Sequence, residues 1–293
     1  MNHQVHRRFL FRALAGLCFS PRAFASNGEV SVKVLGLLHP RLIILAPSGN
    51  NRLRVIAAGQ SQILEGQETV RIAAHMAPLE VSAAGGGPTD FALSIPGVIR
   101  RHYFGTLTIA ATGQILNPVI SMPLEIAVSS IAGAELPVSS APIASLSAQA
   151  VVARSFLTGA GKRHPDADFC DTTHCQFLRS PALPGSKTGQ AVYKTAGLIL
   201  TSEGRALAAR YSAACGGFTE AANQAEAANN AGYLYQHVAC EVCQRLGTPR
   251  RGHGFGLCQE GAMQLAQAGW SWQRIISKYY PGAAVEALSR RGA

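Results

Sequence analysis

The chain has 293 residues, of which 47% are hydrophobic and 14% are charged, and its 26 lysines and arginines outnumber its 16 acidic residues. A chain of this length buries about three quarters of its unfolded surface, and this hydrophobic content argues against wholesale disorder. The long and nearly uncharged stretch 126–153 is interrupted by Ser, Gly, Gln and Pro. Because a membrane span needs roughly 20 predominantly apolar residues, an integral membrane protein is not expected.

The first 25 residues have the pattern of a signal peptide. Arg7-Arg8 forms a basic start, 9–19 is a mostly apolar run, and Ala23-Phe24-Ala25 is an A-x-A cleavage pattern. We therefore expect residues 1–25 to be removed and the protein to be exported to the periplasm or the cell-wall space. Arg7-Arg8 also admits twin-arginine export, and Cys18 is interpreted as an ordinary signal-sequence residue.

Removal of residues 1–25 takes away four arginines and no acidic residue, which leaves 22 basic and 16 acidic residues and a net charge of +6. This excess favours an anionic partner such as a polyanionic glycan. Export, together with the lack of a Lys/Arg run and of an aromatic-basic pattern, argues against a nucleic-acid partner. General solubility is the alternative explanation of the charge.

Residues 26–100 are predicted to form a β-rich N-terminal region. The segment 30–34 alternates apolar with polar residues, as a half-buried strand does. Gly, Pro, Asn or Gln residues separate further short apolar runs, which is typical of strands and their turns. These runs are 42–45, 53–56, 69–72 and 91–95, and 104–109 alternates again.

From Pro123 onward the pattern becomes helical. We predict a short helix over 123–131 and a second helix that is capped by Ser140, contains Pro142 in its first turn and ends at Gly159. One stripe at helical spacing runs along the second helix. It consists of Ile143, Leu146, Ala150, Ala153 and Leu157.

The rest of the chain mixes strands and helices. Strands are predicted at 198–200 and 206–212, and Ser271 is predicted to cap a last helix that stops at Pro281-Gly282. Trp272, Ile276 and Tyr279 share one face of that helix. The predicted fold class is therefore α+β, with a β-rich N-terminal region followed by a mixed α+β core.

Glu135 is an isolated acid in this sequence. It lies among the small apolar residues of 131–137, and no other ionisable group occurs between 126 and 153. Desolvation raises the pKa of such a carboxyl group, which can then protonate a poor leaving group near neutral pH. A helix-end glutamate that faces water is the alternative. Glycoside hydrolysis normally needs a second carboxylate, but Glu125 is ten residues upstream and can be structural.

Two groups of cysteines and histidines are candidate metal ligands. The first has four ligand side chains within 12 residues, which suits a structural tetrahedral zinc, although a Cys170–Cys175 disulfide is the alternative. It consists of His164, Cys170, His174 and Cys175. The second group can form an all-thiolate zinc site or two disulfides, and the sequence alone does not choose. It consists of Cys215, Cys240, Cys243 and Cys258.

A glycine-rich run, 252–256, surrounds His253. It lacks the G-x-G-x-x-G spacing of a dinucleotide site, and its glycines indicate tight turns or close approach of a substrate. His253 could bind or orient a sugar there, and a histidine satisfied within a turn is the alternative.

Several segments, taken in order, resemble the SpoIID/LytB domain. They are 101–107, 123–125 with 133–137, 145–156, 170–176, 211–217, 253–256 and 279–282. Each segment is weak alone, but their shared order makes the resemblance specific and implies a SpoIID/LytB-like domain over 101–288. Residues 26–100 resemble the family only in being rich in predicted strands.

The resemblance implies a peptidoglycan-directed protein. SpoIID is a lytic transglycosylase that acts on glycan strands stripped of stem peptides, whereas LytB-type members were named as amidase enhancers. The family's catalytic glutamate matches Glu135, and some members hold zinc with His and Cys in the region matching 164–175. We therefore expect an exported lytic transglycosylase. The alternative is a non-catalytic peptidoglycan-binding enhancer of an N-acetylmuramoyl-L-alanine amidase.

The family chemistry implies that one carboxylate is sufficient. Glu135 would protonate the glycosidic oxygen after N-acetylmuramic acid and then take the proton of that sugar's own 6-hydroxyl, which gives a 1,6-anhydro end. The candidate substrate contacts are Gln149, Arg154, Tyr211, Ser212, His253 and Gln259. Arg154 could bind a lactyl carboxylate of the glycan or belong to a structural ion pair. Cys258-Gln259-Glu260 departs from the more familiar Ser-Gln-Tyr type, which leaves substrate preference open.

Overall fold

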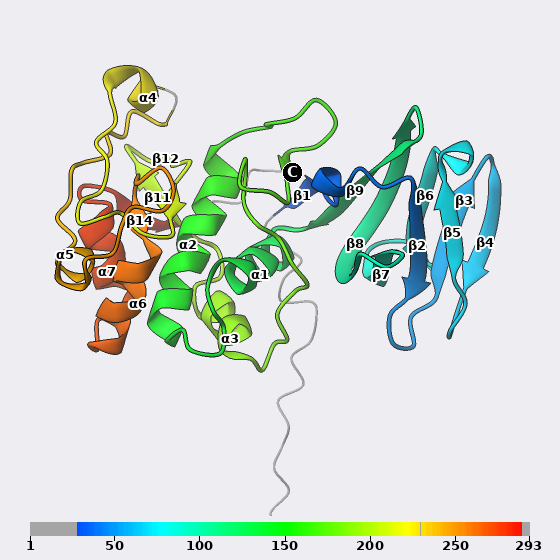
Figure 1. Ribbon diagram of the computed structural model, residues 1–293, viewed down its shortest axis with the longest axis horizontal. Coiled ribbons are helices and arrows are strands. Elements are labelled where there is room, and N and C mark those ends of the chain that lie inside the picture. Colours follow the sequence, from blue (N-terminus) through cyan, green and yellow to red (C-terminus); the bar gives the residue numbers. More distant parts are fainter. Residues whose placement is uncertain (1–27, 229, 289–293) are drawn as a thin grey trace, which may run out of the picture.

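The computed structural model describes residues 28–228 and 230–288, and the predicted signal peptide lies outside them. A curled β region forms one end of the molecule, and helices with short strands form the other (Figure 1). The predicted α+β class is therefore confirmed. Within the described ranges, no helix combines the length and the apolar character that are needed to cross a membrane.

The strands of the N-terminal region form a curled antiparallel sheet. They are β1 (Glu29–Lys33), β2 (Leu42–Pro47), β3 (Leu53–Ala57), β4 (Gln60–Leu64), β5 (Val70–Ala73), β6 (Leu79–Ala83), β7 (Thr89–Ile95), β8 (Ile99–Thr112) and β9 (Ile115–Pro123). The long strand β8 pairs with β7 along its first half and with β6 and β9 along its second half. This change of partners curls the sheet, and alternate residues of β9 are buried against the core.

The strands predicted from alternation are present, and the sheet also contains strands that were not predicted. The predicted boundary between residues 100 and 101 falls within β8, whose pairing continues across it. Strand β4 was not predicted because its sequence, Gln-Ser-Gln-Ile-Leu, is mostly polar, and it is held at the sheet edge by its ladder with β3.

Helix α2 (Ile143–Gly159) is the centre of the second half (Figure 1). Every residue from 145 to 157 is buried, because α1 (Leu124–Glu135), α3 (Lys187–Lys194) and β11 (Leu198–Ser202) pack around α2 together with α6 (Gln259–Gln267) and α7 (Trp272–Tyr279). The predicted apolar stripe therefore describes only one of its buried faces. The predicted Ser140 cap is wrong: the helix starts after Pro142, and Ser140 instead donates to the carbonyl of Pro137 within the preceding turn.

The remaining short elements place two loops side by side. The strand predicted over 206–212 is interrupted, because the N–H groups of Ala208 and Arg210 donate to side chains, Asn230 Oδ1 and Tyr235 Oη, rather than to a ladder. Two short strands result, β12 (Arg205–Ala206), which pairs with β11, and β13 (Tyr211–Ser212), which pairs in parallel with β14 (Leu257–Cys258). The other elements are β10 (Phe169–Cys170), α4 (Gln224–Ala228), α5 (Glu241–Leu246) and β15 (Ala284–Ala287).

The last helix is as predicted. Ser271 precedes α7, and its hydroxyl accepts the N–H of Arg274 at 3.3 Å, as an N-cap does. Ile276 and Tyr279 are buried against α2 and its neighbours, and the helix ends before Pro281-Gly282. This helix therefore completes the second hydrophobic core, which lies on the side of α2 away from the β region.

Candidate functional site

Glu135 is the last residue of α1, four residues beyond the end of the predicted helix. The extra turn places its half-buried carboxylate at the C-terminal end of the helix, where Oε1 accepts the N–H of Phe177 at 2.8 Å. Burial raises the pKa of Glu135, and the Phe177 N–H, Tyr211, Gln259 and Arg179 oppose the rise without cancelling it. The desolvation expected from the sequence is therefore present, and this glutamate does not simply face water.

A cavity of about 350 Å³ opens beside Glu135. Its size is at the lower end of the range for small-ligand pockets. Four of the six predicted substrate contacts line it together with Glu135. They are Tyr211, Ser212, His253 and Gln259. The parallel pairing of β13 with β14 causes this convergence, because it sets Ser212 opposite Cys258, the residue before Gln259.

Buried polar atoms without partners gather at this cavity. Within the described residues, the hydroxyls of Tyr211 and Ser212 and both side-chain polar atoms of Gln176 make no well-formed hydrogen bond. Buried polar groups are almost always bonded in folded proteins, so these atoms have hydrogen-bonding capacity that water or a polar ligand in the cavity can use. The Tyr211 hydroxyl is close enough to Glu135 to lower the pKa of that carboxyl, although it completes no hydrogen bond of good geometry.

Gln149 lies behind the cavity rather than in its wall. Its side chain is fully buried on α2, and its Oε1 accepts the side-chain N–H of Gln259 at 3.3 Å. Gln149 is therefore placed to hold Gln259 in position. It is not among the residues that line the cavity in the described part of the chain.

His253 is exposed on the glycine-rich loop at the rim of the cavity. Its Nδ1 accepts the N–H of Phe255 at 3.0 Å, so the neutral ring carries its proton on Nε2, where it can donate to a sugar hydroxyl. The loop makes the tight turns that its glycines predicted. Gly256 has a φ of +65°, and a Cβ there would collide with the carbonyl of Arg210.

The interpretation of Arg154 as a substrate contact is not supported, and its structural alternative is. The side chain is fully buried, and its Nε and Nη2 donate to the two carboxylate oxygens of Glu125 at 2.8 and 2.7 Å. Nη1 donates to the carbonyl of Leu198 at 3.0 Å. A guanidinium with these partners has no surface with which to reach a glycan, and Glu125 is likewise structural.

Residues that the sequence reasoning did not single out complete the wall. Phe177 holds the Glu135 carboxylate through its N–H, and Gln176 presents an unpartnered amide. Both follow directly on the His/Cys group; the resembling segment 170–176 includes Gln176, whereas Phe177 lies one residue beyond it. Arg210 and Arg251 also line the cavity and bring positive charge to it.

The first His/Cys group is assembled as a metal site would be. The four ligand atoms lie within 4.8 Å of one another, with His164 Nε2 and His174 Nδ1 at 3.4 and 3.5 Å from Cys175 Sγ. Donors on a tetrahedral zinc, with bonds of about 2.0 Å to nitrogen and 2.3 Å to sulfur, are about 3.5 Å apart. Cys170 and Cys175 are free thiols. This group can therefore hold a metal ion, and its donor set suits zinc.

The group connects the β region to the cavity. Strand β10, which ends at Cys170, pairs with β1, and Cys175 lines the cavity two residues before Phe177. A metal ion at this position would fix the segment that supports Glu135. The second cysteine group is also gathered, with all four sulfurs buried and within 4.8 Å of one another.

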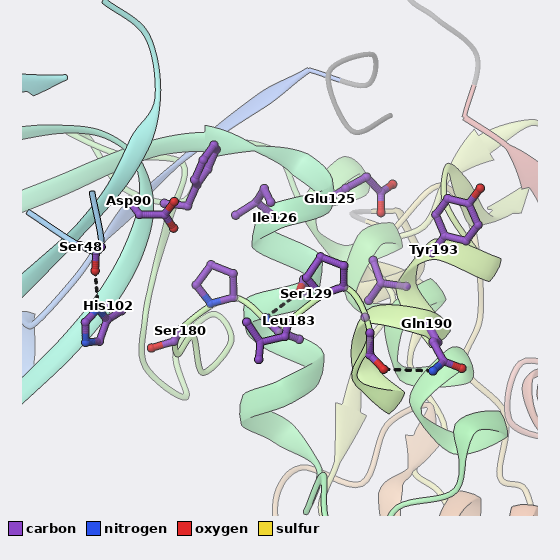
Figure 2. A pocket seen from close by; sticks show the side chains of 18 of the residues that line it. Ser48, Asp90, His102, Glu125, Ile126, Ser129, Ser180, Leu183, Gln190 and Tyr193 are labelled. Carbon is purple, nitrogen blue, oxygen red and sulfur yellow. Dashed lines mark hydrogen bonds between the residues drawn. The ribbon is translucent and has the colours of Figure 1, made fainter. Parts of the chain in front are cut away.

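A larger cavity of about 1000 Å³ lies between the β region and helices α1 and α3 (Figure 2). Its titratable groups do not make an acid–base site. Glu125 is bound to Arg154, and His102 Nδ1 is 2.7 Å from Ser48 Oγ. Burial raises the pKa of Asp90, but none of the predicted substrate contacts shares this space with it. The chemistry therefore points to the smaller cavity beside Glu135.

These features define an α+β protein with a polar pocket built around one half-buried acid. The SpoIID family model, described as Stage II sporulation protein, matches residues 112–202, which confirms the SpoIID resemblance over that segment. The matched segment includes Glu135, helix α2 and the first His/Cys group, and it associates the chain with a cell-wall-related function. No curated protein matches the chain.

Proposed function

We propose that this protein is an exported peptidoglycan lytic transglycosylase that cleaves denuded glycan strands, with Glu135 as its general acid and base. The observation that carries the proposal is a carboxyl group of raised pKa in a cavity lined by unpartnered polar atoms. A carboxyl group whose pKa is raised is a better proton donor to a glycosidic oxygen than an ordinary glutamate at the same pH, and the hydroxyls and amides without partners can bind sugar hydroxyls.

The wall of the cavity favours an intramolecular nucleophile. Among the described residues that line it, Glu135 is the single carboxylic acid. Hydrolysis by an inverting or retaining enzyme needs a second carboxylate about 5–9.5 Å away. In the proposed reaction, Glu135 gives its proton to the glycosidic oxygen as the bond from C1 breaks. The carboxylate then accepts the 6-hydroxyl proton of N-acetylmuramic acid as O6 bonds to C1, which restores the acid.

The charge of the cavity supports a glycan without stem peptides. Removal of the peptides leaves lactyl carboxylates on the glycan. Arg210 and Arg251 line the cavity and can bind such carboxylates. Both arginine side chains are partly or largely exposed. Arg210 is 3.8 Å from Glu226 and Arg251 is 3.6 Å from Glu260, and such exposed pairs are weak, so a ligand carboxylate can replace the glutamate in either pair. They take the role that the sequence interpretation gave to Arg154.

Mass spectrometry of products from denuded glycan tests the proposal. The purified protein is expected to release fragments with 1,6-anhydro-N-acetylmuramic acid ends, which are lighter by one water than hydrolysis products. Products with an added water would refute the transglycosylase mechanism. Denuded glycan left intact, together with faster release of stem peptides from peptide-bearing peptidoglycan by an added amidase, would support the enhancer alternative instead.

Tyr211→Phe is expected to move the pH profile of the reaction. The hydroxyl favours the ionised form of Glu135, so its removal raises the pKa of that carboxyl further. Because the general acid must be protonated, the alkaline limb of kcat/KM should shift to higher pH. The fold should remain intact, since the hydroxyl completes no hydrogen bond within the described residues.

The control for this profile is Tyr233→Phe. The Tyr233 hydroxyl donates to Pro281 outside the cavity, and its loss should leave the alkaline limb in place. If the alkaline limb of kcat/KM stayed in place in Tyr211→Phe, or moved to lower pH, the proposed role of Glu135 would be contradicted.

We propose that the first His/Cys group binds one structural zinc ion. His174→Ala is expected to remove about one equivalent of zinc per chain, measured by elemental analysis of protein prepared without chelator. His237→Ala is the control, since this histidine stacks on Phe218 and belongs to neither candidate metal group. An unchanged zinc content in His174→Ala, or a mapped Cys170–Cys175 bridge in the wild type, would reject this site.

A further inference from the structure

We propose that Cys215, Cys240, Cys243 and Cys258 form a second, four-thiolate zinc site that holds together the two loops carrying the cavity wall. All four side chains are at most 1% exposed, and their sulfur atoms lie within 4.8 Å of one another. They come from separate parts of the chain: the segment after β13, the start and body of α5, and the end of β14. Four buried thiols gathered in this way match the ligand set of a structural tetrahedral zinc site.

The sulfur spacing suits coordination and not a disulfide. Cys243 Sγ and Cys258 Sγ are 3.6 Å apart, and all four cysteines are free. Two thiolates on a tetrahedral zinc, each about 2.3 Å from the metal, are separated by about 3.8 Å. A disulfide would need about 2.0 Å.

The surroundings donate hydrogen bonds to the sulfurs. The N–H of Gly261 donates to Cys258 Sγ at 3.3 Å, and the backbone amides of Gly217 and Cys243 lie beside the sulfurs of Cys215 and Cys240. Such donors stabilise metal-bound thiolates, as outer-shell partners of metal sites do.

The packing leaves no room for a larger residue beside this cluster. The Tyr279 hydroxyl is 3.2 Å from Cys240 Sγ. A Cβ on Gly261 would overlap that hydroxyl and would come within 2.8 Å of Cys240 Sγ. Gly261, Tyr279 and the thiolates therefore form a closed shell, as in a structural site, with no open position for a substrate.

The site lies immediately behind the cavity. Cys258 is opposite Ser212 in the β13–β14 pair and directly precedes Gln259, while Cys215 is three residues after Ser212. A metal ion bound to both cysteines would fix the separation of these two loops, and with it the wall that faces Glu135. This consequence rests on the proposed function, whereas the metal site itself does not.

Metal content is the first test. Protein prepared without chelator is expected to hold about two zinc equivalents, of which Cys240→Ser and His174→Ala each remove about one. The two sites are thereby separated, since a zinc retained in His174→Ala and lost in Cys240→Ser belongs to the thiolate group. X-ray absorption should count about three sulfur neighbours per zinc in the wild type, the mean of a two-sulfur and a four-sulfur site.

Wild-type measurements keep the proposal testable if Cys240→Ser does not fold. One zinc equivalent with about two sulfur neighbours, bound iron in place of zinc, or mapped bridges among the four cysteines would overturn it. If the variant folds, amide exchange in 211–217 and 257–261 should become at least about tenfold faster than in the wild type, with β7–β9 unchanged. Unchanged exchange there would contradict the role in joining the loops, and none of these readouts depends on glycan cleavage.

Discussion

Glu135→Gln is expected to fold and to bind glycan as the wild type does, while its activity on denuded glycan falls by at least about 10²-fold. In the wild type, the N–H of Phe177 donates to Oε1 of Glu135, and the side-chain carbonyl oxygen of a glutamine can accept the same hydrogen bond. It cannot give a proton to the glycosidic oxygen or take one from the 6-hydroxyl. Release of anhydro-sugar products, measured by mass spectrometry under single-turnover conditions, separates this chemical defect from slow product release.

The direction of the stability change in this variant can also be predicted. The folded protein binds the Glu135 proton more tightly than the unfolded chain does, because burial raises the pKa of the carboxyl group. The ionised side chain therefore destabilises the fold increasingly as pH rises from the unfolded pKa through the folded one. A neutral glutamine removes that penalty, so Glu135→Gln should be at least as stable as the wild type at neutral pH.

Glu241→Gln is the matched control, since Glu241 is exposed and pairs with Lys278 away from the cavity. It should retain wild-type activity. Undiminished release of anhydro products by Glu135→Gln would reject the catalytic assignment, and equal losses in both variants would indicate a nonspecific effect of charge.

Glu135 could be recognised from the sequence because its isolation is a local property. The absence of other ionisable groups over 126–153 already implied desolvation, and burial in the structure raises the pKa of the carboxyl as expected. The role of Arg154 could not be recognised in the same way. Its partner Glu125 is 29 residues away on another helix, and only the packing of α1 against α2 brings the two charges together.

The same distinction holds for the fold and the rest of the site. Strands such as β2 and β7 follow from their own apolar runs, whereas β13 and β14 are two residues each and exist only because they pair with one another. The meeting of Ser212 with Gln259 and the gathering of the four buried cysteines depend on that pairing. No local pattern in either segment specifies it.

Arg154→Met is expected to destabilise the protein by about 3–5 kcal/mol, the usual cost of leaving one member of a buried ion pair without its partner. Methionine keeps much of the side-chain length, but it removes both donors to the Glu125 carboxylate and the donor to the Leu198 carbonyl. Glu125 would retain the N–H of Gly197 at 3.0 Å as its partner. The free energy of unfolding from urea titration measures the effect.

Arg52→Met provides the comparison, because Arg52 and Glu65 form an ion pair of the same length, 2.7 Å, with both side chains about 60% exposed. Solvent already screens that pair, so its loss should cost about 0–1 kcal/mol. The large difference between the two variants would follow from the burial of the Arg154–Glu125 pair and from the additional hydrogen bonds of Arg154. If Arg154→Met instead unfolded like the wild type and bound denuded glycan more weakly, Arg154 would be a ligand contact, and its burial between α1 and α2 would have to open in solution.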